Sequence, residues 1–311
     1  MITFSDFTRK DIPCALELIK TNYEEQMTSN PVLPPFSNCP PLDEFAENGL
    51  GLSAYEGGRL VGFLCWYRPW QQHFGKTAGT FSPLHAHGAI KENRGRVYSL
   101  LFEHAAQKLV RQGILSYAIA LYSNDTETVN SFFWNGFGLR CVDAIRPMEE
   151  LSVMPCTDYR FRELAQTEKL KAFRLKNALV EHLNASPMFI PLPPFTEAQF
   201  LEMFDDSRFF VAEENGEVFA FLEVTSDGES FVGEDTSMMN ICGAYMQKPY
   251  RGTGVYARLL NYTIRTLKAE GYTRLGVDCE SFNPTARGFW LKHFTPYVFS
   301  VTRRIDERIY G

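Results

Sequence analysis

Two stretches of the 311-residue sequence carry groups that could do chemistry. The first is KPYRGTGVYARLL, residues 248–260, in which Arg251, Gly252 and Gly254 stand directly before a helical pattern of apolar residues. A helix begins with about four unpartnered amides and the positive end of its dipole, so it attracts anions. Glycines let the backbone take positive φ and approach a ligand closely. The stretch predicts a phosphate or diphosphate site, although Gly-x-Gly before a helix can also be only a tight connection.

The second stretch is YTRLGVDCE, residues 272–280, which has the pattern of a strand. Asp278 and Glu280 alternate with apolar neighbours, and side chains two apart on a strand share a face. Two carboxylates on one face could attract a cationic amine and remove its proton. The alternative is that they are solvated or paired with Arg274.

The composition narrows the class of protein. Hydrophobic residues make up 45% and charged residues 22% of the chain, as in ordinary globular proteins, and no apolar run approaches the roughly 20 residues of a membrane span. A net charge of −6 without a block of Lys and Arg argues against a nucleic-acid partner. The sequence shows no export signal and its seven cysteines form no C-x-x-C pair, which favours a cytoplasmic protein. His85 and His87 have no evident third ligand, so we expect no metal site.

The chain repeats itself once, at an offset of 158 residues. Such self-similarity indicates two copies of one domain, which we expect at residues 1–150 and 155–311. Two pairs of stretches carry the repeat most clearly: VYSLLFEHAAQKLVRQG (97–113) with VYARLLNYTIRTLKAEG (255–271), and SAYEGGRLVGFL (53–64) with VAEENGEVFAFL (211–222).

Each copy predicts the same order of elements. A strand and a helix lead through a Pro-rich loop to a hairpin, turned at Gly57-Gly58 in one copy and Asn215-Gly216 in the other. A strand, a long helix, a strand, a short helix and a closing strand follow. Hairpins and crossovers mix in this order, so we expect α/β (α+β) domains, each with a mixed, mostly antiparallel twisted sheet flanked by helices.

The run AYMQKPYRGTGVYARLL, followed by a strand and by NPTARGFWLKHF, resembles the GNAT acetyltransferase superfamily. In that family an Arg/Gln-x-x-Gly-x-Gly/Ala turn wraps the diphosphate of acetyl-CoA, the preceding strand end lies beside the pantetheine arm, and a later Asn-x-x-Ala helix flanks the cofactor. The resemblance implies an acetyl-CoA site in the second copy. Its expected residues are Tyr245 and Met246 at the strand end, Arg251, Gly252, Thr253, Gly254, Val255 and Tyr256 in the turn, and Asn283 and Phe289 in the later helix.

The resemblance implies an N-acetyltransferase, an acyltransferase that moves an acetyl group from acetyl-CoA to an amine. The net charge of −6 and the two carboxylates favour a small, cationic acceptor. A strand-end amide at Tyr245 or Met246 would contact the thioester carbonyl, and Asp278 or Glu280 would take the proton of the amine. The alternative is a non-catalytic acyl-CoA-binding or sensor protein of the same fold.

Two positions depart from the family pattern. Tyr256 stands where the family has a small residue, which is expected to tilt the start of the helix without removing its amides. Trp290 stands where many members place a tyrosine that protonates the departing thiolate, so Tyr297 is the expected substitute.

The first copy differs from the second at its site positions. Arg96 replaces Gly254, and an arginine side chain there would crowd the turn; Ala120 and Tyr122 replace the two carboxylates. We therefore expect the second copy to hold the site and the first to be degenerate. The alternative is that Arg96 points to solvent and both copies bind CoA.

Overall fold

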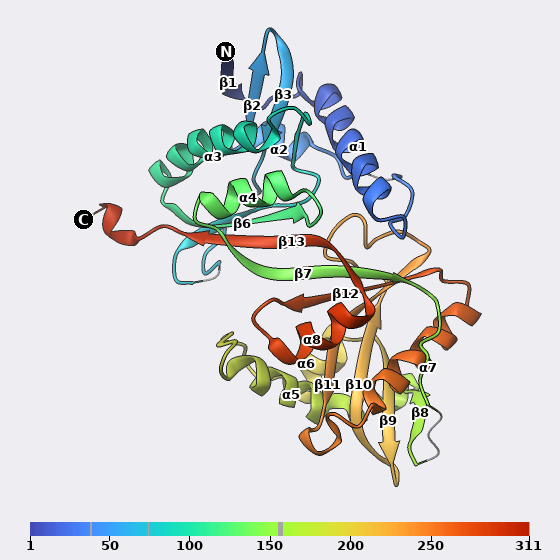
Figure 1. The fold of residues 1–311 in the computed structure, drawn as a ribbon. Helices are drawn as coiled ribbons and strands as arrows, with labels where there is room; N and C mark the ends of the chain where they lie inside the picture. Colours follow the sequence, from blue (N-terminus) through green and yellow to red (C-terminus); the bar gives the residue numbers. More distant parts are fainter. Residues whose placement is uncertain (38, 74, 155–157, 311) are drawn as a thin grey trace. The chain divides into compact units, whose positions relative to one another are not determined.

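The computed structural model describes residues 1–37, 39–73, 75–154 and 158–310 (Figure 1). The chain forms two compact units: Met1–Asp143 with the segment from Pro296 onward make unit 1, and Ala144–Thr295 make unit 2. The chain passes from one unit to the other within strand β7 (Gly138–Pro147). The final segment, which the sequence repeat places in the second copy, thus packs with the unit built from the first.

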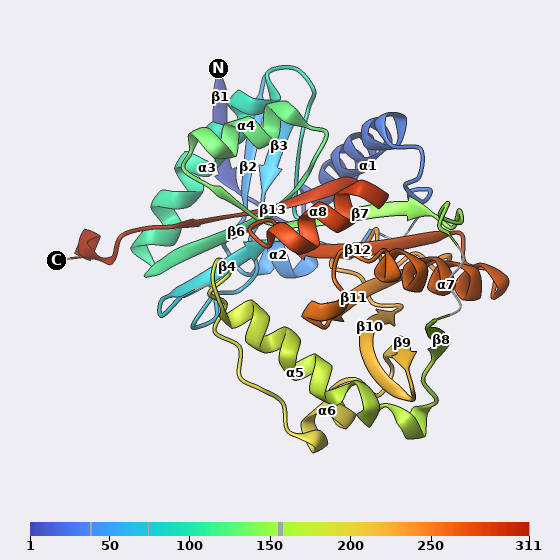
Figure 2. The ribbon, with the colours of Figure 1, turned by 60° about the horizontal axis from the view of Figure 1, so that its bottom comes forward.

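Unit 1 has two sheets. Its first is antiparallel, in the order β1-β2-β3-β5; in its second, β6 pairs in parallel with β4 and antiparallel with β13, which lies beside it in both views (Figures 1 and 2). The strands are β1 (Ile2–Asp6), β2 (Leu52–Glu56), β3 (Arg59–Leu64), β4 (Ala78–Ser82), β5 (His87–Ala89), β6 (Ile114–Tyr122) and β13 (Thr295–Arg304). The helices are α1 (Ile12–Ser29), α2 (Asp43–Glu47), α3 (Arg94–Arg111), α4 (Thr126–Trp134) and the short η3 (Glu307–Tyr310).

The core of unit 1 forms around α3. Its apolar residues Val97, Leu101, Ala105 and Leu109 recur every fourth position, so they form one stripe on the helix. This stripe packs with side chains of β2, β3 and β6, and with Val301 of β13, in one buried cluster. The predicted helical period therefore fixes which face of α3 covers the sheet.

Unit 2 has one sheet, in which β12, β11, β10, β9 and β8 are neighbours in that order. The pairs are antiparallel except for β11 with β12, which is parallel. The strands are β8 (Arg160–Glu163), β9 (Arg208–Glu214), β10 (Glu217–Thr225), β11 (Met238–Met246) and β12 (Arg274–Glu280). The helices are η1 (Gln166–Glu168), α5 (Leu170–Asn184), α6 (Glu197–Met203), η2 (Lys248–Tyr250), α7 (Val255–Ala269) and α8 (Pro284–His293).

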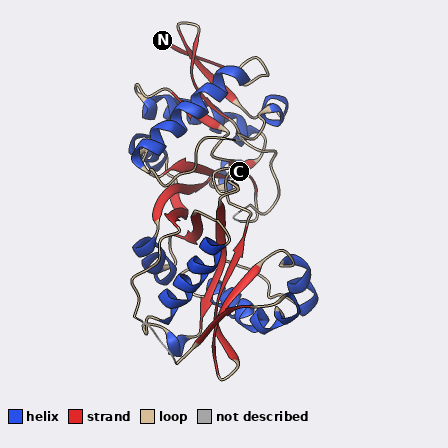
Figure 3. Ribbon diagram, turned by 90° about the vertical axis from the view of Figure 1, so that its right-hand side faces the viewer, coloured by secondary structure: helices blue, strands red, loops and turns tan. Residues whose placement is uncertain are grey.

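Helices cover both faces of the strands in unit 2 (Figure 3). Helix α5 packs on β10 and β11, and α7 packs on β9 and β10. The hairpin between β9 and β10 turns at Asn215 and Gly216, whose φ values of 52° and 86° match the predicted two-residue turn. Each unit thus mixes antiparallel strands with one parallel pair under a cover of helices, and the predicted fold class is confirmed.

The long helix α7 follows the sequence pattern closely. Its buried residues include the predicted stripe of Val255, Leu259, Leu260, Ile264 and Leu267. Gly271, with φ of 101°, follows the helix end, as expected of a residue that stops a helix. Among the described residues, no helix combines the length and the apolar character that crossing a bilayer requires.

Candidate active site

The sheet of unit 2 opens where β11 and β12 separate. The two strands pair in parallel as far as Ile241 and Val277. One residue further along β11 there is a bulge against β10, in which Cys242 is the extra residue, and a bulge bends its strand. Beyond the bulge, no strand pairing with β12 is present in the described part of the chain. The end of β11, up to Met246, therefore forms one side of a cleft.

A buried ion pair supports the bulge. Lys176 of α5 binds the carboxylate of Glu223, and the hydroxyl of Ser207 donates to the same carboxylate at 3.1 Å. Gly243 lies directly over this pair, where a Cβ would collide with both charged groups. Removing one partner of a buried pair is strongly destabilising. The opening of the sheet is thus fixed by packing and charge.

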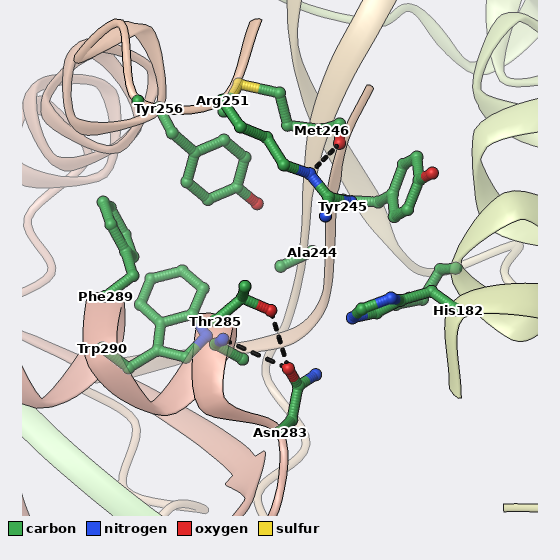
Figure 4. Close-up of a pocket in the computed structure, with 13 residues that line it drawn as sticks. His182, Ala244, Tyr245, Met246, Arg251, Tyr256, Asn283, Thr285, Phe289 and Trp290 are labelled. Carbon is green, nitrogen blue, oxygen red and sulfur yellow. Dashed lines mark hydrogen bonds between the residues drawn. The ribbon is translucent and has the colours of Figure 1, made fainter. Parts of the chain in front are cut away.

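The cleft is lined by four elements and has a volume of about 280 Å³ (Figure 4). The end of β11 supplies Ala244, Tyr245 and Met246, and α5 supplies Leu179 and His182. The remaining wall is aromatic: Tyr256 of α7 and Phe289 and Trp290 of α8 pack edge to face, with ring centroids 4.9 to 6.1 Å apart. Such a channel suits an apolar, extended chain with few polar groups.

The glycine turn lies at the mouth of this cleft and is open. Gly252 and Gly254 have φ of 80° and 79°, a region that favours glycine, and Gly254 is the N-cap of α7. Among the described residues, a Cβ on Gly252 would meet no atom within 4 Å, and one on Gly254 would meet only the Nη1 of Arg258, at 3.7 Å. The described part of the chain therefore leaves the space over the turn free for a ligand.

The amides of the turn are available to an acceptor. From Gly252 to Ala257, none donates a hydrogen bond to another described residue. Arg251 lines the cleft, where its Nε donates to the carbonyl of Met246 at 3.0 Å and its guanidinium lies 5.4 Å from the ring centroid of Tyr245. Unpartnered amides at a helix start with an arginine beside them form an anion site.

Arg258 adds a second cation that the sequence reasoning missed. Its Nη1 donates to the carbonyl of Thr253 at 3.4 Å, within the turn itself. Residues four apart on a helix share a face, so the position four after Gly254 could have been read as facing the turn.

Asn283 positions the start of α8 at the other lip of the cleft. Its Oδ1 accepts from the amide of Ala286 at 3.3 Å and from the hydroxyl of Thr285 at 2.8 Å. An asparagine at the N-cap commonly stabilises a helix by about 1 kcal/mol. Asn283 and Phe289 thus line the cleft together, as the sequence motif predicts for cofactor-binding residues.

The side chains of two predicted turn residues are engaged within the protein. Val255, the first residue of α7, has a buried side chain, and the hydroxyl of Thr253 donates to the carbonyl of Tyr250 at 2.6 Å. Their contribution to ligand binding would come from their amides.

A second cavity of about 140 Å³ adjoins the cleft and shares Ala244, Asn283 and Trp290 with it. Asp278 and Glu280 both line this cavity, so the two predicted carboxylates are brought to one place. Arg274, the alternative partner considered for them, donates from its Nη1 to the hydroxyl of Ser237 at 2.8 Å at the start of β12.

Asp278 is the titratable group best placed for proton transfer. Burial, followed by the negative charges of Glu229 and Glu280, raises its pKa to about 7. A general base works best with a pKa near the working pH. Perturbed carboxyl groups in a cavity are frequent at catalytic sites.

Neither Tyr256 of the turn nor Tyr297, the expected acid, is placed to protonate a thiolate in the cleft. The hydroxyl of Tyr256 donates to the carbonyl of Phe221 at 2.8 Å, and burial raises its pKa well above the usual range. Tyr256 therefore acts as a wall of the cleft. Tyr297 is buried in unit 1, where its carbonyl accepts from the amide of Ser123 at 2.9 Å, and it lines neither the cleft nor the adjoining cavity.

His182 was missed by the sequence reasoning. Its ring points into the cleft from the last turn of α5, opposite the start of α8 (Figure 4). Leu175, Leu179 and His182 follow one another at spacings of four and three, so the apolar stripe of α5 could have indicated that this histidine faces inward.

Comparison with known proteins assigns unit 2 to a family. Residues 177–294, from within α5 to the end of α8, match the model of the Acetyltransferase (GNAT) family. Unit 2 contains a GNAT acetyltransferase domain. The resemblance predicted from the glycine turn is confirmed, and the cleft, the turn and the adjoining cavity all lie within this GNAT domain.

Two solved structures with TM-scores above 0.5 resemble this chain over 97% of its length. A GCN5-related N-acetyltransferase from Sphaerobacter thermophilus is 11% identical, with a TM-score of 0.61 over 97% of this chain and 95% of that one. A GCN5-related glucosamine N-acetyltransferase region of a fungal multi-domain GH3 β-N-acetylglucosaminidase is 14% identical, with a TM-score of 0.54 over 97% of this chain and 38% of that one. A tandem GNAT protein from the clavulanic acid biosynthesis pathway is 12% identical, with a TM-score of 0.45 over 97% of both chains. No curated protein matches the sequence.

At the turn in unit 1 that corresponds to the GNAT turn, the chain supplies charged partners from its own side chains, beside a cavity of about 370 Å³ that Arg94, Asp125 and Glu127 line. The amide of Gly95, at the start of α3, donates to the carboxylate of Glu127 at 3.0 Å. Arg94 is buried and pairs with Asp125 at 3.0 Å and with Glu25 at 2.8 Å. The expectation that Arg96 crowds this turn is wrong: α3 begins at Arg94, so Arg96 is already inside the helix, where its side chain is exposed.

The strands of unit 1 are bridged where those of the GNAT domain open. The Nδ1 of His87 is 2.8 Å from the hydroxyl of Tyr98, and its Nε2 is 2.7 Å from the carbonyl of Ala120 on β6. Both ring nitrogens are therefore engaged within the core. Tyr122, at the position of Glu280, packs its ring against Tyr23, at a centroid distance of 6.3 Å.

Proposed function

We propose that unit 2 is an N-acetyltransferase that moves an acetyl group from acetyl-CoA to the amine of a small, cationic acceptor. The observation that carries the proposal is the continuity of three features: the open glycine turn, the aromatic cleft, and a cavity with a carboxyl group whose pKa is about 7. The turn would hold the diphosphate, the cleft would hold the arm that carries the thioester, and the cavity would hold the amine beside a base.

The residues present fit acetyl-CoA. The amides from Gly252 to Ala257, which donate to no described residue, would hold its diphosphate together with Arg251 and Arg258. The apolar cleft would hold the pantetheine arm beside the end of β11, whose edge toward β12 is unpaired beyond Ile241 in the described part of the chain. Amides of that edge, at Tyr245 or Met246, could bind the thioester carbonyl. When bound, acetyl-CoA supplies an acetyl group activated as a thioester.

The adjoining cavity fits a cationic amine. Asp278 and Glu280 line it, and Glu229 acts on Asp278 from the loop before β11. In its ionised form Asp278 would take the proton of the ammonium and leave the amine able to attack. Holding the amine beside the thioester would itself supply much of the rate.

The departing CoA thiolate must finally gain a proton, and no residue of the cleft is assigned to donate it. Trp290 occupies the position of the tyrosine that serves as acid in many family members, and Tyr297 does not line the cleft. A CoA thiolate is a stable leaving group, so the reaction does not require an acid from the protein. Tyr297 remains a prediction from the sequence, as does a cytoplasmic location.

Thiol release tests the proposal. Purified protein is mixed with acetyl-CoA and with primary amines of net charge zero, +1 and +2, and free CoA thiol is measured over time. We expect amine-dependent release that increases with positive charge. Binding of acetyl-CoA without any release above the hydrolysis control would instead support the alternative of a non-catalytic acyl-CoA-binding protein.

A further inference from the structure

His182 lies in a row of side chains that leads to the glycine turn. The centroids of the His182 and Tyr245 rings are 6.4 Å apart, and the guanidinium of Arg251 lies over the Tyr245 ring at 5.4 Å. Figure 4 shows the imidazole directed into the cleft that Arg251 and Gly252 also line. The imidazole is thus open to the cleft and close to the cation of the turn.

The groups that act on His182 come from four neighbouring segments. Arg251 in the turn and Lys248 in η2 are positive, and Asn283 at the N-cap of α8 and Tyr245 of β11 are its polar neighbours. Burial, followed by the charge of Arg251, lowers the pKa of His182, while the Asn283 side chain acts in the opposite direction. Burial and the two cations therefore favour the neutral imidazole in the free protein.

We propose that His182 is a cofactor-binding residue that takes up a proton when a diphosphate binds at the glycine turn. The proposal rests on the function proposed above. A bound diphosphate would place negative charge against Arg251 and Lys248, the two cations that oppose protonation of the imidazole. The proton would come from solvent and bind a ring nitrogen, and the imidazolium would add a further positive charge to the site.

Linkage gives the direction of the pH effect. Because the bound form would hold a proton more tightly than the free form, affinity is greatest at low pH and falls as the pH rises through the pKa of the bound state. The decrease is at most about tenfold per pH unit. Removing the imidazole should flatten this dependence.

Titration calorimetry tests the proposal directly. Acetyl-CoA is titrated into the full chain at pH 7 in two phosphate-free buffers whose protonation enthalpies differ, which gives the number of protons taken up. The variants are His182→Gln and His182→Asn. His293→Gln is the matched control, because burial and the neighbouring Arg146 and Lys292 also lower the pKa of His293, which does not line the cleft. The phosphate monoester of acetyl-CoA also titrates near neutral pH, so the difference between proteins is the readout.

We expect the wild type and His293→Gln to take up the same number of protons, and both His182 variants to take up fewer, by up to about one proton. Equal uptake by the wild type and a folded His182 variant would overturn the proposal and leave the proposed function intact. No uptake by a wild type that binds acetyl-CoA would overturn it as well. A wild type that does not bind acetyl-CoA would overturn both.

Discussion

The starts of the two long helices, α3 in unit 1 and α7 in unit 2, differ in what accepts from their amides. In unit 1 the carboxylate of Glu127 accepts from the amide of Gly95, so the chain supplies an anion to its own helix start. In unit 2 the amides from Gly252 to Ala257 donate to no described residue. A helix start needs an acceptor for its amides. One unit supplies it internally, whereas the other leaves it to a ligand.

The same contrast extends along the strands. In unit 1 His87 joins Tyr98 to the carbonyl of Ala120, and Tyr23 and Tyr122 pack where unit 2 has a cavity. In unit 2 the corresponding space is lined by carboxylates. In unit 1 the bridging histidine and the two tyrosine rings are part of the buried interior. In unit 2 the carboxylates face a cavity, where they can contact a substrate.

Asp278→Asn should have the largest effect. Loss of the general base is expected to lower the rate of acetyl transfer by ~10²–10⁴-fold, while the affinity for acetyl-CoA remains close to that of the wild type. Steady-state kinetics and calorimetry measure the two quantities separately. Asp227→Asn, in the exposed part of the same loop as Glu229, is the control. A rate within twofold of the wild type would show that Asp278 is not the base.

Thr285→Glu would place in unit 2 the carboxylate that Glu127 provides in unit 1. Thr285 lines the cleft one residue after the first of α8, at the position that Glu127 occupies in the repeat. A carboxylate there would compete with a diphosphate for the amides of the turn, so acetyl-CoA should bind ~10–100-fold more weakly. Thr285→Gln has a similar size without the charge and should bind more tightly than Thr285→Glu. Equal affinities of the two variants for acetyl-CoA would mean that the negative charge at position 285 does not compete with the diphosphate.

The pH dependence should follow Asp278, whose pKa is raised to about 7. A base must be ionised to act, so the rate at saturating acetyl-CoA should increase roughly tenfold between pH 6 and pH 8 and then level off. Asp278→Asn should lose this dependence. A profile unchanged in the variant would assign the titration to another group.

Glu127→Gln should have the smallest effect. It replaces a charged acceptor at the start of α3 with a neutral one, which is expected to lower the free energy of unfolding by about 1 kcal/mol. Denaturant unfolding measures this change. The variant should gain no acetyl-CoA binding, because the Arg94 ion pairs and the His87 bridge remain. New binding in unit 1 would indicate that Glu127 alone keeps it closed.

Local patterns made much of the fold predictable. The stripe of α7 and the Asn215-Gly216 turn depend on residues close together in the sequence, where period and turn chemistry are decisive. The glycine turn was predictable for the same reason, since its amides and its positive φ values belong to a few consecutive residues.

The remaining features depend on contacts between distant residues. Glu127 reaches Gly95 only once α4 packs against α3, and β13 pairs with β6 rather than following the order of the repeat. The raised pKa of Asp278 requires the burial that the whole of unit 2 provides. His182 faces the cleft because α5 packs on β11, which a helical period can suggest without naming the partner strand.

The stoichiometry of acetyl-CoA binding tests the contrast between the units most directly. Calorimetric titration of the wild type should give one site per chain, and Gly254→Arg should abolish it. Gly271→Arg, a substitution at another open, positive-φ glycine just after the C-terminal end of α7, should leave the site intact. Two sites per chain, or one site of unchanged affinity in Gly254→Arg, would contradict a single acetyl-CoA site at the open turn of unit 2.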